Sequence, residues 1–143
     1  MRTIVLTLCC AALALGAGCG KEGANVQIKN KDVNIQAAGG SNTVALPDNF
    51  PKDVPMIPGG SVKTAITTND VVSIALIASA PVEEVAKYYR DNLQSQGWKL
   101  ESTALIGQVT MVSASKDQRN FGAQIVKGDD GTTVMITLRA KNG

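Results

Sequence analysis

The stretch SAPVEEVAKYYRDNLQSQGW, residues 79–98, carries the clearest helical pattern of the chain. Ser79 or Ala80 is suited to the N-cap, Pro81 fits the first turn, and two glutamates follow near the positive end of the helix dipole. Gly97 can adopt the left-handed conformation that ends many helices. Apolar residues recur at helical spacing and form one stripe: Val82, Val85, Ala86, Tyr89 and Leu93. The pattern predicts a helix that packs one face on the rest of the domain.

On both sides of this helix the sequence indicates short strands separated by turns. Two candidate strands precede the helix and four follow it, at residues 61–68, 71–79, 98–105, 109–115, 121–126 and 132–139. Strands with short connections pair antiparallel, and one helix can cover one face of such a sheet. We therefore expect an α+β domain of element order ββαββββ, with an antiparallel sheet of about five to six strands.

Two segments before these strands differ in composition from the rest. Residues 46–60 contain closely spaced prolines, which exclude helix and central strand, so we expect an extended segment that packs apolar side chains on the domain. Residues 19–46 are rich in Gly, Asn, Lys and Gln and predict a tether. Within the tether, apolar and polar residues alternate on both sides of Asn30 and Lys31, which is a weak hairpin signal over residues 25–36. The folded domain is expected over residues 47–143.

The first 18 residues have the layout of a secretory signal peptide: a basic start at Arg2, an apolar run and a tail of small residues. The apolar run is shorter than the roughly 20 residues that a membrane-spanning helix needs. The residues LGAGC at positions 15–19 resemble the lipobox of bacterial lipoproteins, although Gly16 stands where Leu is usual. An ordinary cleaved signal peptide, which would leave Cys19 as a free thiol, is the alternative.

The lipobox resemblance implies cleavage before Cys19 and a lipid, with palmitate-type acyl chains, attached to this cysteine. Two or three acyl chains suffice as a stable membrane anchor. The mature protein would then face the periplasm of a bacterial cell envelope. Gly20 follows the cysteine where an Asp would favour the inner membrane, so the resemblance favours the outer membrane.

Catalysis and metal binding find little support in the sequence. The chain has no histidine, which removes the commonest general base and zinc ligand. Glu83 and Glu84 point in different directions on a helix, and Asp129 and Asp130 lie between glycines as expected of a solvated turn. A formal net charge of +2 without a basic cluster gives no nucleic-acid footprint. We expect no enzyme activity, no metal and no cofactor.

Three motifs together resemble a domain found in many small bacterial lipoproteins. They are an FPxDVPxxPG opening at residues 50–59, an EEVxxYYRxxL helix at residues 83–93, and the pair Gly97 and Trp98. The resemblance covers residues 46–138, and it implies a shared domain structure without a defined activity. Tyr88, Tyr89 and Trp98 gather around the helix and its end. Core packing is their expected role, and a small-ligand pocket is the alternative.

The strand at residues 71–79 is apolar on both faces, yet one helix covers only one side of a sheet. Ala75, Ile77 and Met135 are therefore candidate binding residues on the other side, and we expect residues 50–57 to cover that side in part. The first functional hypothesis is a non-enzymatic envelope lipoprotein that binds an envelope protein partner, a cell-wall polymer or a second copy of itself. The alternative is a carrier or sensor of a small apolar ligand held between helix and sheet.

Overall fold

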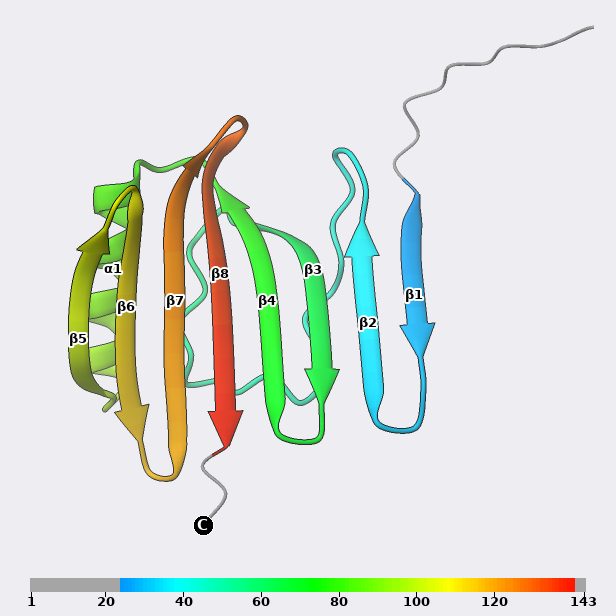
Figure 1. Ribbon diagram of the computed structural model, residues 1–143, viewed down its shortest axis with the longest axis horizontal. Coiled ribbons are helices and arrows are strands. Elements are labelled where there is room, and N and C mark those ends of the chain that lie inside the picture. Colours follow the sequence, from blue (N-terminus) through cyan, green and yellow to red (C-terminus); the bar gives the residue numbers. More distant parts are fainter. Residues whose placement is uncertain (1–23, 141–143) are drawn as a thin grey trace, which may run out of the picture.

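The structure, a computed structural model, describes residues 24–140. It contains one helix, α1 (Val82–Ser95), and one antiparallel sheet of eight strands (Figure 1). The strands are β1 (Asn25–Lys29), β2 (Val33–Ala38), β3 (Ser61–Thr68), β4 (Val71–Ala78), β5 (Lys99–Ile106), β6 (Val109–Lys116), β7 (Arg119–Gly128) and β8 (Gly131–Ala140). Their spatial order is β1-β2-β3-β4-β8-β7-β6-β5. The expected α+β class, with an antiparallel sheet and one helix, is confirmed.

The expected number of five to six strands was wrong, and so was the expected element order. Strands β1 and β2 precede the other six, so the order along the described chain is ββββαββββ. An isolated hairpin is marginal in water, but β2 pairs with the free edge of β3, for example through Ile35 and Ile66. The sheet therefore begins inside the segment that was expected to be a tether.

The helix packs across β5, β6 and β7 because its apolar stripe faces them. Val85, Ala86, Tyr89 and Leu93 are buried, as the spacing predicts, and Val82 is half-buried. The helix begins one or two residues later than expected for a cap at Ser79 or Ala80. Pro81 is the N-cap residue and has an extended backbone, and a residue before proline is itself disfavoured in helical conformation.

The C-terminal end of α1 follows the prediction from Gly97. This glycine has a φ of +82°, and its N–H donates to the carbonyl of Gln94 at 3.0 Å. The next N–H, of Trp98, donates to the carbonyl of Leu93 at 2.9 Å. These two bonds form a Schellman motif, which satisfies the last carbonyls of the helix and directs Trp98 toward the core.

The proline-rich segment, residues 46–60, covers the part of the sheet that the helix leaves open, on the same side as the helix (Figure 1). Val54 and Ile57 are buried in the same core as the helix residues. The expectation that residues 50–57 cover the opposite side was wrong. Hydrogen bonds from Tyr88 to the carbonyl of Met56 and from Trp98 to the carbonyl of Asp53 hold this segment beside the helix.

Candidate functional site

The predicted aromatic residues lie in or beside the core. Tyr89 and Trp98 are buried, and both rings lie near Phe121, with centroids 6.0 and 6.1 Å away. Tyr88 is half-buried and donates its hydroxyl to the carbonyl of Met56 at 2.7 Å. Burial raises the pKa of both tyrosines, Tyr89 most strongly. The rings fill the space under the middle of the helix, so the space for a ligand lies elsewhere.

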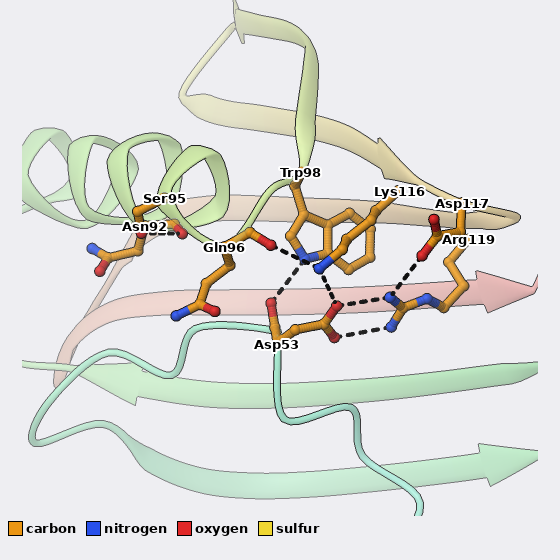
Figure 2. A network of polar contacts seen from close by, with 8 residues as sticks. All are labelled: Asp53, Asn92, Ser95, Gln96, Trp98, Lys116, Asp117 and Arg119. Carbon is orange, nitrogen blue, oxygen red and sulfur yellow. Dashed lines mark hydrogen bonds and ion pairs between the residues drawn. The ribbon is translucent and has the colours of Figure 1, made fainter.

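Asp53 is the centre of a polar network that the sequence analysis did not single out (Figure 2). Arg119 donates to its two carboxylate oxygens from Nη1 at 2.9 Å and from Nη2 at 2.7 Å. Lys116 donates from Nζ to Oδ2 of Asp53 at 2.9 Å and to the carbonyl of Gln96 at 2.7 Å. The indole Nε1 of Trp98 donates to the backbone carbonyl of Asp53 at 2.8 Å. Three segments of the chain therefore meet at Asp53: the proline-rich segment, the end of α1 and the β6–β7 turn.

The charges of this network satisfy one another. The hydrogen bond from Arg119, and after it the one from Lys116, holds the pKa of the Asp53 carboxyl well below its usual range. The same carboxylate raises the pKa of Arg119, whose guanidinium carbon also lies 5.0 Å from the centre of the Trp98 ring. A carboxylate held in this way is a poor proton acceptor near neutral pH. The network is a clamp that fixes the proline-rich segment to the end of the helix.

A groove of about 800 Å³ opens at the other end of the helix. Its walls come from the first turn of α1, the β5–β6 turn and the β7–β8 turn. Leu105 lines it and is 72% exposed, the largest value among the exposed large apolar residues of the described chain. Val82 and Ala80 line it from the helix side, and the buried Thr132 donates to the carbonyl of Ala80 at 2.6 Å. The volume lies in the range of small-molecule sites, about 300–1,000 Å³.

The groove also carries charge at its rim. Glu83, Lys127 and Asp129 line it, and none of the three forms an ion pair with another residue among those the structure describes. The apolar wall and the charged rim suit a ligand with an apolar body and a polar end. Sequence reasoning missed this groove, because its walls come from three segments that are far apart in the chain: residues 79–83, 105–110 and 127–132.

The three candidate binding residues on the sheet share the face opposite α1. Ala75 and Met135 are direct cross-strand partners, and Ile77 lies two residues along β4 on the same face. Met135 is 45% exposed, while Ala75 and Ile77 are half-buried by their neighbours. Cys19, the predicted lipid attachment site, and the predicted signal peptide lie outside the described residues.

Within residues 24–140, no three His, Cys, Asp or Glu side chains gather where they could hold a metal ion. The helix of that same region is too short and too polar to cross a bilayer.

No curated protein and no solved structure matches the chain. A family model described as START domain-like matches residues 61–140, which contain β3 to β8 and the helix, the core of the domain described above. The match spans more than half of the sequence, and the chain therefore belongs to the START domain-like family.

Proposed function

We propose that the protein is a lipid-anchored, non-enzymatic protein of the bacterial cell envelope whose domain binds a small apolar ligand. The observation that carries the ligand proposal is the groove at the first turn of α1, with the exposed Leu105 in its wall. The START domain-like family match is compatible with a ligand-binding module. The space between helix and sheet is filled below Tyr89, so the ligand would lie at the N-terminal end of the helix instead.

The groove offers a place for a ligand although the described residues contain one helix. The β5–β6 and β7–β8 turns contribute its far walls, beyond the first turn of the helix. Gly131 allows the close approach of β8 to the end of β4, because a Cβ at this position would lie 2.5 Å from the carbonyl oxygen of Ala78. The buried helix stripe and the Asp53 clamp hold the other end of the helix. The proposed site therefore lies between the first turn of the helix and the two strand turns, outside the core.

Anchoring is tested by Cys19→Ser. The lipobox-like residues before Cys19 predict that this variant loses its acyl chains and leaves the membrane fraction. Cell fractionation followed by immunoblotting measures the change, with the parent protein as reference. A variant that stays as firmly membrane-bound as the parent would show that the anchor lies elsewhere.

Ligand binding is tested with the uncharged apolar dye Nile red and the Cys19→Ser protein in detergent-free buffer. Leu105→Glu places a carboxylate in the apolar wall, and we expect it to weaken dye binding about tenfold because the charge would be desolvated. Met135→Glu is the matched control, since Met135 is also an exposed apolar strand residue but lies on the opposite face. Equal weakening by both variants, or by Met135→Glu alone, would contradict the groove as the site.

The first sequence hypothesis, binding of an envelope protein, a cell-wall polymer or a second copy of the chain, is the second candidate function. The observation in its favour is the half-exposed apolar face around Ala75, Ile77 and Met135. This face is separate from the groove, so the two functions do not exclude each other.

A further inference from the structure

The middle of the sheet face opposite α1 is uncharged across all eight strands. Charges on this face lie at its margins: Lys99 and Arg139 near one end of the strands, and Lys63 beside Ser61 and Ile77 near the other. The pairing registers place one row of side chains across all eight strands: Val26, Ala37, Thr64, Ala75, Met135, Gln124, Met111 and Ala104. The row on one side of it is Ile28, Ile35, Ile66, Ser73, Thr137, Gly122, Ser113 and Ser102. The row on the other side is Ser61, Ile77, Thr133, Val126, Val109 and Ile106. None of these residues is charged.

The three rows resemble the inner face of a β-sandwich rather than an ordinary outer face. An antiparallel sheet with one solvated face usually alternates apolar and polar side chains, and its solvated face carries charges. Here the three rows consist of small, hydroxyl-bearing and aliphatic residues, two methionines and Gln124. Val26, Ile28, Ile106 and Met135 are among the exposed large apolar residues. The proline-rich segment that could have covered them packs on the helix side instead. Within the described chain this face has no cover.

From these observations we propose that the face is a homodimer interface, covered by the same face of a second copy. Two sheets of the same sequence have the same twist, which is the condition for aligned packing of sheets about 10 Å apart. The uncharged rows of two copies would meet without repulsion between like charges. Small side chains in the rows would allow the two sheets to approach closely.

The size of the face fits this occupant. Eight strands about 4.8 Å apart give a width of about 38 Å, and three rows along the strands span about 20 Å. The resulting area of roughly 750 Å² is close to the ~800 Å² per partner of a standard protein interface. A dimer would therefore use most of the face.

The composition argues against two other occupants. A membrane-surface patch is typically rich in Trp or Phe with Lys and Arg around them, and the three rows contain no aromatic residue. Interfaces with unrelated proteins commonly centre on Trp, Tyr or Arg, and the rows contain none of these. Sheet-on-sheet packing needs none of them.

The test is cross-linking of the full-length protein in intact cells. Met135→Cys places a thiol on β8, near the middle of the face, and a bismaleimide that spans the ~10 Å between packed sheets should link two copies. Leu105→Cys is the matched control, because Leu105 is more exposed than Met135 but lies in the groove on the helix side. The parent protein is a second control, because it shows how much cross-linking occurs through the cysteines that the sequence already contains.

A charge in the row that contains Met135 should lower the amount of cross-linked dimer. Gln124→Lys in the Met135→Cys background is expected to lower the cross-linked dimer at least fivefold, because the lysine would be buried against its symmetry mate. Gln124 is exposed and its replacement should fold; Gln108→Lys, in the groove, is the control that should leave the dimer unchanged. The proposal is supported if Met135→Cys gives a cross-linked dimer and the additional Gln124→Lys substitution removes it. No dimer, equal cross-linking at Leu105→Cys, insensitivity to Gln124→Lys, or a product containing a different protein would overturn it.

Discussion

Leu93→Ala is expected to lower the free energy of unfolding by about 2–5 kcal/mol, because Leu93 has no exposed surface and its side chain would leave a cavity under α1. The size of the loss depends on how far the core can collapse into that cavity. Leu93 belongs to the same buried core as Tyr89, Trp98 and Phe121, and the other two rings lie near Phe121. Bulky rings in well-packed surroundings leave a core little room to collapse. We therefore expect a value in the upper half of the range. Urea unfolding followed by circular dichroism measures the change.

Leu105→Ala is the matched control for this experiment. The substitution is the same, but Leu105 is 72% exposed, so its replacement should change the free energy of unfolding by less than about 0.5 kcal/mol. If Leu93→Ala unfolds at the same urea concentration as the parent protein, the apolar stripe of the helix does not form the core and the described packing is wrong.

Asp53→Asn is expected to lower the free energy of unfolding by about 1–3 kcal/mol at neutral pH. The substitution removes the charge that Arg119 and Lys116 share, and it weakens or breaks the three charge-assisted hydrogen bonds that they donate. The Asp53 side chain is 25% exposed, so the loss is smaller than for a fully buried pair. Asp48→Asn is the matched control. Asp48 lies exposed in the same segment, and no ion pair engages it within the described residues.

The contribution of Asp53 should depend on pH in one direction. Its folded-state pKa is lowered, so the unfolded chain takes up the proton first as the pH falls. The stabilisation is therefore present above the unfolded pKa of about 3.9 and is lost progressively below about pH 5. The difference in unfolding free energy between the parent and Asp53→Asn should shrink between pH 5 and pH 2, as measured by urea titration at each pH. A difference that is constant over this range would contradict the ionic role of the clamp.

Local patterns in the sequence predicted the helix and its end. The buried residues Val85, Tyr89 and Leu93 follow a period that is set within the helix itself, and Gly97 ends it by its own conformational freedom. The strands after the helix were also predicted to within a few residues, because each turn is short and carries its own turn residues. These features depend on neighbours along the chain, so one sequence suffices to find them.

The remaining features depend on residues that are far apart in the chain. Asp53 meets Arg119 66 positions later, and an isolated Asp in a proline-rich segment gives no sign of this partner. The β1–β2 hairpin gave only a weak signal, because its stability comes from pairing with β3 rather than from its own residues. The groove depends on how far two turns extend beyond the helix. The side of the sheet on which residues 50–57 pack follows from long-range contacts, namely the burial of Val54 and Ile57 and the bonds that reach Met56 and Asp53. Periodicity along the chain cannot show such contacts.

The place of β8 in the sheet has a consequence for folding kinetics. This last strand lies in the middle and pairs with β4 on one side and β7 on the other, so it joins two sets of strands that are otherwise unconnected. Its pairing with β4, such as that between Val71 and Arg139, closes a long loop, and loop closure of this kind slows folding. Until the C-terminal strand is available, both β4 and β7 present open edges that can pair with other chains. A chain without β8 would keep two sets of strands that no strand pairing joins, so synthesis of β8 is a condition for the eight-stranded sheet.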